Sequence, residues 1–369
     1  MAEPLKSSYG PAIPRRIGAM IAAVHPDFDE RAFVRDALRG YDALELMGRG
    51  RHIARALHGH LPRDFPVAAR ILVASMGPPQ AGGGSGLAPF LYMPHAFYVA
   101  EHGLDHFEEA MAAQHAITQR FTAEFSIRPF LQRHPERTLA RLHEWTADPN
   151  EHVRRLVSEG TRPRLPWAPR LPAFQRDPAP VLALLEALRD DPSLYVRRSV
   201  ANNLNDIGKD HPELLVEVCR RWMRDAPPER EWVVRHALRV AVKRGDAGAL
   251  RVLGFAGGED LAVEAARVGP GRARIGGSVR VEFDVANRGR RPQRAVVDFR
   301  IHYVKASGRA SPKVFKLKAV ELAPGERVSL AKSVSLADMT TRRHHPGRHA
   351  VDALVNGRAV PLGTFLLAG

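Results

Sequence analysis

A repeated motif in the middle of the 369-residue chain constrains the fold more than any other sequence feature. The stretch DPNEHVRRLVSEG at Asp148–Gly160 recurs as DPSLYVRRSVANN at Asp191–Asn203, and Val196 follows Val153 by 43 residues. A looser copy, PEREWVVRHALR, lies at Pro228–Arg239. We expect each copy to be a helix with Asp at the N-cap where present, Pro at the first helical position, and a buried Val before basic residues. A period of about 40–47 residues is typical of stacked helical pairs, which form a solenoid.

Helical periodicity extends over most of the first 260 residues. Apolar residues recur every three or four positions, with Pro and Gly between segments, in Ile17–Val24, Ala32–Gly40, Ala43–Leu61, Val67–Met76, Leu91–Glu101, His106–Phe125, Ile127–Arg133, Pro135–Thr146 and the repeats up to Asp246–Gly258. The stretch GPPQAGGGSGLAP at Gly77–Pro89 is too rich in Gly and Pro for regular structure, so it predicts an exposed loop. We therefore expect a HEAT-like helical-repeat solenoid over residues 1–260.

The periodicity changes after Gly269. Short runs rich in Val and Phe, several of them alternating, lie at Val279–Ala286, Ala295–Val304, Val314–Val320, Arg327–Leu336, His349–Val355 and Val360–Leu367. Turn sequences such as His-Pro-Gly and Asn-Gly-Arg separate these runs. Six or seven short strands predict an antiparallel, all-β immunoglobulin-like sandwich over residues 261–369.

Positive charge is concentrated in the predicted β-domain. The net charge is +15, and residues 261–369 hold 20 Lys and Arg against 8 Asp and Glu, which leaves +12 there and +3 in the first 260 residues. Strand alternation places several basic residues on or near an outward face: Arg280, Arg300, Lys313, Lys316 and Lys318. A basic field favours a polyanion, with nucleic acid as the first candidate and an anionic membrane as the second. The alternative is a basic surface that only aids solubility.

Cysteine use and hydropathy indicate a cytoplasmic protein. Cys219 is the only cysteine, so the chain has neither a disulfide framework nor a Cys-based metal site. The apolar run Ile17–Val24 has eight residues and is followed at once by Pro and acidic residues, so it is too short to span a bilayer.

Helical spacing predicts two neighbouring stripes of polar side chains, one on each repeat. The first comprises His152, Arg155 and Glu159, and the second comprises Ser199, Asn202 and Asp206. Beyond the first helix lies TRPRLPW, where we expect two prolines to hold the chain extended and to present Trp167 with Arg162 and Arg164. Carboxylates repel DNA phosphates, so their presence among arginines suits a site that holds a cation. The alternative is that Glu159 pairs with Arg155 as surface decoration and Trp167 only caps a repeat.

Three segments together resemble a known family. FTAEFSIRPFL at Phe121–Leu131, EHVRRLVSEGTRPRLPW at Glu151–Trp167 and SVANNLNDIGKDHPE at Ser199–Glu213 resemble, in the same order, the HEAT-like-repeat DNA alkylation repair glycosylases, and the AlkC branch more than AlkD. The resemblance covers roughly residues 12–255, and some AlkC-type members also carry a C-terminal immunoglobulin-like domain. It implies base excision repair of cationic alkylated bases in double-stranded DNA: 3-methyladenine, 3-methylcytosine and 1-methyladenine. The bacterial location it implies is the cytoplasm, at the nucleoid.

The resemblance also implies roles for individual residues. Glu124, Glu159 and Asp206 match the catalytic or lesion-facing carboxylates, Trp167 matches an aromatic residue near the lesion, and Arg155 matches a supporting or DNA-contacting arginine. Arg162 and Arg164 are further candidates for DNA binding. We expect a monomer without a cofactor or a membrane partner.

The expected chemistry is hydrolysis without a covalent intermediate. An alkylated cationic base is already a good leaving group, and departure gives the deoxyribose oxocarbenium character that carboxylates stabilise. A lyase would need a nucleophilic lysine, and the first 260 residues contain only Lys6, Lys209 and Lys243. Lys209 fits a helix cap or a phosphate contact better. The histidines at 344, 345 and 349 have no acidic or Cys ligands nearby in sequence, so we expect no metal site.

Two other functions fit the same sequence. One is a non-catalytic helical-repeat scaffold that binds DNA or a protein, because fold alone does not establish chemistry. The other is a damage sensor that binds lesions without excising them. The β-domain itself suits either a DNA clamp or a module that docks a partner.

Overall fold

The computed structural model describes residues 5–80, 88–255, 258–339 and 342–369. Most of the predicted loop at Gly77–Pro89 lies outside the described residues. The chain forms two compact units, of which unit 1 comprises Met1–Asp210 with Pro228–His236, and unit 2 comprises His211–Pro227 with Ala237–Gly369. Strands begin at Leu261, but the contacts group three preceding helices with them. A domain boundary between residues 260 and 261 therefore remains a prediction.

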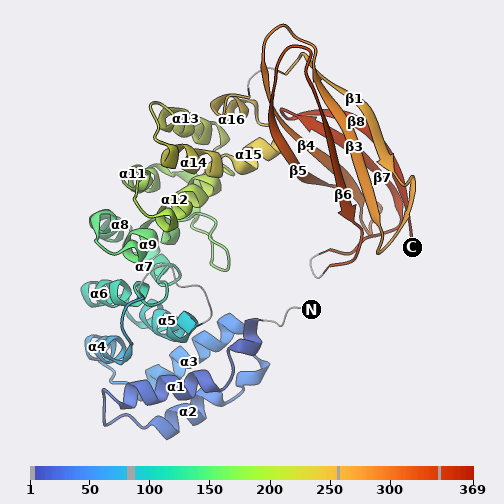
Figure 1. Cartoon of the computed structure of the whole chain (residues 1–369). Coiled ribbons are helices and arrows are strands. Elements are labelled where there is room, and N and C mark those ends of the chain that lie inside the picture. The colour runs from blue at the N-terminus through green and yellow to red at the C-terminus, as the bar shows by residue number, and fades with distance from the viewer. Residues whose placement is uncertain (1–4, 81–87, 256–257, 340–341) are drawn as a thin grey trace. The chain divides into compact units, whose positions relative to one another are not determined.

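Unit 1 is a stack of α-helices (Figure 1), and the predicted HEAT-like solenoid class is confirmed. Its helices are α1 (Ala12–Ala22), α2 (Glu30–Leu38), α3 (Leu46–His60), α4 (Phe65–Ser75), α5 (Met93–His102), α6 (Phe107–Thr118), α7 (Ile127–Arg133), α8 (Pro135–Glu144), α9 (Glu151–Gly160), α10 (Pro172–Arg176), α11 (Ala179–Leu188), α12 (Leu194–Ile207) and most of α14 (Pro228–Ala237). Short 3₁₀ segments occupy Leu5–Ser8, Tyr41–Ala43, Ala88–Tyr92 and Trp145–Ala147. Successive helices pack in pairs, and α9 lies against α12, its counterpart in the next repeat.

The repeat motif forms helices, but its caps differ from the prediction. The N-cap side chains are Asn150 for α9 and Ser193 for α12, each accepting from a backbone N–H two residues on. Asp148 instead accepts from the N–H of Asn150, and Asp191 from that of Ser193. Each aspartate thus closes a turn before its helix, with the proline in that turn rather than at the first helical position.

Arginines on the two repeat helices hold these turns in the same way. Arg154 donates to the carbonyls of Asp148 and Pro149, and Arg197 donates to those of Asp191 and Pro192. Arg154 also donates from Nε to the Asp191 carboxylate at 2.6 Å, which links the two repeats. The first arginine of each basic pair is therefore structural. Arg155 and Arg198, the second ones, line the cleft described below.

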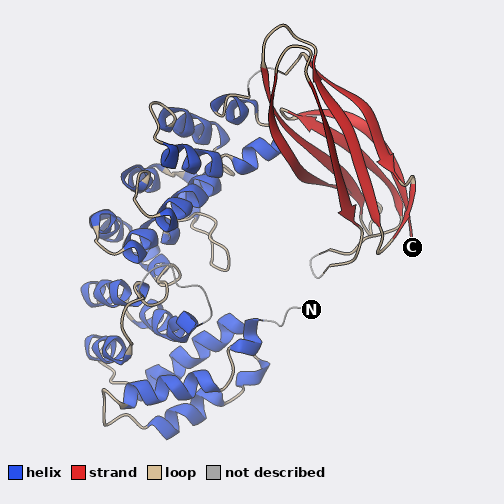
Figure 2. Cartoon of the chain, viewed as in Figure 1, coloured by secondary structure: helices blue, strands red, loops and turns tan. Residues whose placement is uncertain are grey.

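Unit 2 joins three helices to a β-sandwich (Figure 2). The helices are α13 (Pro212–Trp222), α15 (Arg239–Arg244) and α16 (Ala247–Val252), and the strands are β1 (Leu261–Gly269), β2 (Arg272–Arg274), β3 (Ser278–Asn287), β4 (Gln293–Val304), β5 (Ala310–Leu322), β6 (Arg327–Ser335), β7 (Gly347–Val355) and β8 (Arg358–Ala368). One sheet has the order β1-β3-β6 and the other β2-β8-β7-β4-β5; all pairs are antiparallel except β2 with β8.

The predicted sandwich is confirmed, but the sequence pattern missed two strands. Only Leu261 of β1 is buried, and a bulge between Glu264 and Arg267 interrupts the alternation, so its sequence lacks a clear period of two. The three residues of β2 are too few to show a period. Both sheets bury Val and Phe side chains such as Phe283, Phe299 and Phe365 in one core.

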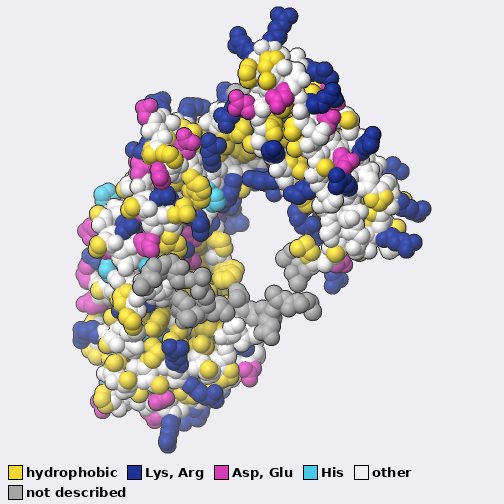
Figure 3. Space-filling view, in the orientation of Figure 1, with side chains coloured by type: hydrophobic (Ala, Val, Ile, Leu, Met, Phe, Trp, Pro, Cys, Tyr) yellow, Lys and Arg dark blue, Asp and Glu magenta, His cyan; other side chains and the backbone are white. Residues whose placement is uncertain are grey.

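Basic side chains stand on the surface of the sandwich, where Figure 3 shows many Lys and Arg groups. The predicted outward positions Arg280, Lys316 and Lys318 are exposed, and Arg300 and Lys313 are partly exposed. Among the described residues, no helix is both long enough and apolar enough to cross a membrane.

Candidate functional site

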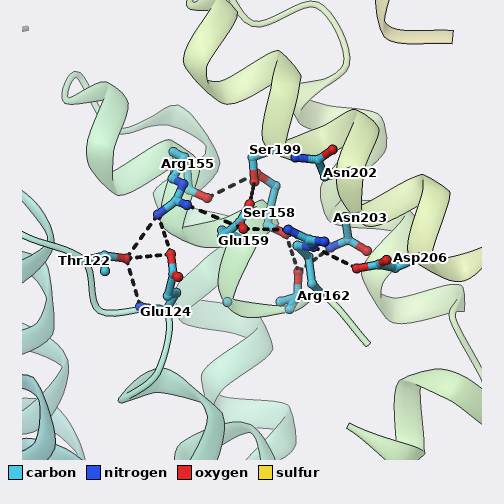
Figure 4. Close-up of polar contacts among 12 residues, drawn as sticks. Thr122, Glu124, Arg155, Ser158, Glu159, Arg162, Ser199, Asn202, Asn203 and Asp206 are labelled. Atoms are coloured by element: carbon cyan, nitrogen blue, oxygen red, sulfur yellow. Dashed lines mark hydrogen bonds and ion pairs between the residues drawn. The ribbon is translucent and has the colours of Figure 1, made fainter. Parts of the chain in front are cut away.

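A cleft of about 630 Å³ opens in unit 1 beside α9 and α12. Its lining combines aromatic and aliphatic side chains with two carboxylates and two arginines: Met47, Gln80, Phe90, Phe121, Thr122, Glu124, Phe125, His152, Arg155, Glu159, Leu165, Pro166, Trp167, Leu194, Tyr195 and Arg198. Two of the three segments that carry the family resemblance, Phe121–Leu131 and Glu151–Trp167, therefore line one cavity, and the third begins at Ser199, directly after the lining residue Arg198. Figure 4 shows the polar contacts beside it.

Glu124 enters the cleft from a turn and not from a helix. We expected helical structure over His106–Phe125, but α6 ends at Thr118 and the turn precedes α7. Thr122 explains the local structure, because its hydroxyl accepts from the N–H of Glu124 at 3.2 Å and donates to Oε2 of Glu124 at 2.9 Å. The hydroxyl thereby holds the turn and orients the carboxylate.

Glu159 lies near the end of α9 with 6% of its surface exposed. Arg162 Nη1 donates to its Oε1 at 2.8 Å, Arg155 Nη2 lies 3.5 Å from the same oxygen, and Ser199 Oγ donates to Oε2 at 2.6 Å. Burial alone would raise the pKa of Glu159, but Arg155, Arg162 and the Ser199 hydroxyl together hold that pKa below its ordinary value. Glu159 is therefore a carboxylate kept ionised at the cleft wall.

Asp206 is brought near Glu159 but does not line the cleft. It is 1% exposed, and one of its oxygens accepts from Arg162 Nε at 2.8 Å (Figure 4). The other oxygen accepts from Lys209 Nζ at 2.6 Å. Arg162 thus bridges Glu159 and Asp206. The predicted catalytic role of Asp206 remains a prediction, while its contacts are those of a structural group that holds Arg162 in place behind the cleft wall.

Arg155 lies between the two cleft carboxylates. Its Nη1 donates to Glu124 Oε2 at 2.5 Å and to Thr122 Oγ1 at 3.1 Å, and its guanidinium carbon lies 5.2 Å from the centre of the Tyr195 ring. Burial lowers the pKa of Arg155, but Glu124 and Glu159 outweigh burial and raise it above the ordinary arginine value. The site therefore already holds one cation between carboxylates and an aromatic ring.

Tyr195 was missed by the sequence analysis. It sits one position before the buried Val196, and its ring packs edge-on against His152 at 5.4 Å while forming part of the cleft wall. The signal was available, because Tyr195 lies four positions before Ser199 on the same helical stripe. His152, on the predicted stripe, is 5% exposed.

Trp167 lies at the mouth of the cleft with 62% of its surface exposed, but its segment is not extended as we expected. The N–H of Ala168 donates to the carbonyl of Leu165 at 3.4 Å, with Pro166 and Trp167 between them. Trp167 has φ of 64°, which a turn of this kind requires at its third residue and normally obtains from Gly. Pro166 favours the turn by fixing φ at its second residue, and the strain at Trp167 presents the indole to solvent.

The two arginines after α9 are engaged with carboxylates. Arg162 is 9% exposed between Glu159 and Asp206, and Arg164 donates from Nε to Asp210 at 2.9 Å. Their predicted role in DNA binding remains a prediction. Arg198 at the cleft has no ion pair among the described residues and is exposed, so it suits a phosphate contact better.

The described residues contain no group of three or more His, Cys, Asp or Glu side chains that could hold a metal ion. None of the cleft-lining residues is a lysine. The cleft therefore offers carboxylates, guanidinium groups and aromatic rings to a ligand.

Comparisons with known proteins agree with this arrangement. Residues 105–240 match the family model for DNA alkylation repair enzymes, and residues 262–369 match that for the C-terminal immunoglobulin-like domain of the uncharacterised protein YhaZ. The chain is 38% identical to the uncharacterised protein YhaZ of Bacillus subtilis (strain 168) over 355 residues, 96% of each sequence. A solved structure of the Pseudomonas fluorescens alkylpurine DNA glycosylase AlkC, bound to DNA containing an abasic site analogue, superposes with a TM-score of 0.92 at 38% identity and covers 100% of both chains.

The fold and cleft thus define a DNA alkylation repair enzyme built from helical repeats and an immunoglobulin-like domain. Within that class, the chain belongs to the AlkC branch.

Proposed function

We propose that this protein is a monofunctional DNA glycosylase that hydrolyses the N-glycosidic bond of cationic alkylated bases, namely 3-methyladenine, 3-methylcytosine and 1-methyladenine. The observation that carries the proposal is the pair of carboxylates, Glu124 and Glu159, on one aromatic-walled cleft. The similarity to AlkC over the full chain supports it, because that enzyme is described as an alkylpurine DNA glycosylase and was solved with DNA containing an abasic site analogue.

The carboxylates suit the charge that develops in this reaction. As the cationic base departs, it takes the bonding electron pair and becomes neutral, while the deoxyribose gains oxocarbenium character. Preorganised Glu124 and Glu159 stabilise that positive charge, and one of them orients the attacking water and accepts its proton. The lowered pKa of Glu159 supports this role, since the group must be ionised to act.

Selectivity for a cationic base follows from the same groups. The neutral parent base gains no charge–charge attraction from Glu124 and Glu159, whereas the alkylated base does. Tyr195 and Trp167 add stacking or cation–π contacts worth roughly 0.5–2 kcal/mol to a positive ring.

The absence of lysine among the cleft-lining residues supports hydrolysis rather than Schiff-base chemistry. Lys209, the candidate nearest the site, donates to the buried Asp206 at 2.6 Å. The product of the proposed reaction is therefore an abasic site in duplex DNA and a free base.

The test is single-turnover release of each base from defined duplexes by wild type and by Glu159→Gln. We expect release by the wild type and a loss of about 100-fold or more in the variant, with DNA affinity retained. Glu144→Gln is the matched control, because this α8 glutamate has a side chain 69% exposed and lies outside the cleft lining. Tight DNA binding without release of any of the three bases would instead favour the scaffold or damage-sensor function.

A further inference from the structure

The two carboxylate oxygens of Glu159 have different partners (Figure 4). Oε1 faces the guanidinium groups of Arg162 at 2.8 Å and Arg155 at 3.5 Å. Oε2 accepts from Ser199 Oγ at 2.6 Å, across from α12. The two cations hold Oε1, and the Ser199 hydroxyl gives Oε2 a separate donor from the next repeat, so both oxygens are positioned.

We propose that Ser199 is a positioning residue that fixes Glu159 for base excision, an inference that rests on the proposed glycosylase function. A serine inside a helix usually donates to a carbonyl of its own helix. Ser199 on α12 instead donates to Glu159 on α9. Because an ionised carboxylate can only accept, the hydroxyl proton of this pair must come from Ser199.

A second buried hydroxyl lies behind Ser199 on α9. Ser158 Oγ lies 2.8 Å from Ser199 Oγ and 3.1 Å from the carbonyl oxygen of Arg155 on its own helix, and Ser158 and Ser199 are 0% and 3% exposed. Asn203 holds the backbone there by donating from Nδ2 to the carbonyl of Ser158 at 2.7 Å. With water excluded, a hydrogen bond to an ionised group is stronger than one at the surface.

Charged and titratable groups surround Glu159 on every side. They are Arg155 on its own helix, Arg162 in the segment after it, Tyr195 on α12, Glu124 beyond Arg155, and Asp206 beyond Arg162. Of the three groups that contact the Glu159 oxygens, Ser199 is the uncharged one. Its removal leaves Oε2 buried without that donor, so protonation of Glu159 becomes easier while the net charge of the site is unchanged.

The experiment is the pH profile of single-turnover excision by wild type and Ser199→Ala. Activity requires ionised Glu159 and is lost as pH falls through its pKa. We expect the acidic midpoint of the variant to move up by about 1–2 pH units, with DNA affinity at neutral pH unchanged. Ser199→Thr keeps the hydroxyl and should keep the wild-type midpoint, and Ser199→Cys, a weak donor, should give an intermediate one.

Ser158→Ala is the matched control, because it removes an equally buried hydroxyl that does not touch Glu159. An unchanged midpoint in Ser199→Ala, or an equal shift in Ser158→Ala, would overturn the proposal. If the wild type releases no base, the glycosylase function fails, and the contact is then tested by unfolding. Ser199→Ala should weaken the pH dependence of stability in the wild type but not in a Glu159→Gln background, and an equal effect in both would overturn the contact's role.

Discussion

Replacing Asp206 with Asn tests whether this buried carboxylate has a structural role or a catalytic one. Asp206 is 1% exposed and receives Arg162 Nε at 2.8 Å and Lys209 Nζ at 2.6 Å. Asn keeps the shape and one acceptor oxygen but loses the charge. Arg162 then retains Glu159 as its only carboxylate, so it neutralises Glu159 more strongly and weakens the charge that the cleft presents.

The magnitude follows from burial. Breaking a buried ion pair costs about 3–5 kcal/mol, whereas an exposed one contributes under about 1 kcal/mol. The ion pair of Asp206 with Arg162 is buried, and the ion pair with Lys209 is intermediate between buried and exposed, because the lysine side chain is 36% exposed. Because Asn still accepts one hydrogen bond, we expect Asp206→Asn to lower the free energy of unfolding by about 2–3 kcal/mol. For a body of about 200 residues, this lowers Tm by roughly 4–12 °C.

The assay combines urea unfolding with single-turnover excision. Asp210→Asn is the control, because Asp210 receives Arg164 at a more exposed position and should lose about 1 kcal/mol or less. If Asp206→Asn has the same free energy of unfolding as wild type yet is inactive, the structural role of Asp206 is refuted. That result would favour the predicted catalytic role of Asp206.

Three further predictions concern packing, pH and DNA affinity. Gly160→Ala should cost about 1–3 kcal/mol, because its Cβ would lie 2.5 Å from Ile127 Cγ2. Ile127→Ala removes that methyl group, so the double variant should lose less stability than the sum of the two single variants, and wild-type stability of Gly160→Ala would contradict the clash. Burial lowers the pKa of His95 from 6.5 to about 4, so between those pH values the unfolded state binds more protons than the folded state. The free energy of unfolding therefore decreases as pH falls through that window. The free energy of unfolding, measured with urea, should decrease by about 2 kcal/mol from pH 7 to pH 5 because of this group. His95→Gln should abolish that decrease, and an unchanged pH dependence in the variant would show that another group is responsible. If the exposed side chains of Lys316 and Lys318 contact phosphates, changing both to Gln should reduce the slope of log affinity against log salt by about 0.9 each, whereas an unchanged slope would exclude them.

Much of the fold could be predicted because periodicity is a local property. The 43-residue register located α9 and α12, and the buried valines Val153 and Val196 lie where spacing put them, both fully buried. Errors occurred where a side chain competes with the regular pattern. The Thr122 hydroxyl holds a turn at Glu124, where spacing predicted a continued helix, and Pro166 with Trp167 makes a turn where prolines suggested an extended chain.

The candidate site was less accessible from the sequence. Spacing placed Glu159 and Asp206 on equivalent stripes, but it could not show that Arg162 would reach both of them or that Asp206 would lie outside the cleft lining. Tyr195 lies on the same stripe as Ser199, but the stripe alone does not show that its ring packs against His152 of the neighbouring repeat.

The sequence by itself determined the helical repeats, the change to strands and the concentration of basic charge, because these follow from composition and from periods of 3.6 and 2 residues. The candidate carboxylates came from helical spacing together with the family resemblance. Only the tertiary structure decided which of those carboxylates face a common cleft. That choice depends on contacts such as Ser199 to Glu159 and Arg162 to Asp206, which join residues 40 and 44 positions apart. Such contacts are set by how α9 and α12 pack, and no local pattern encodes their geometry.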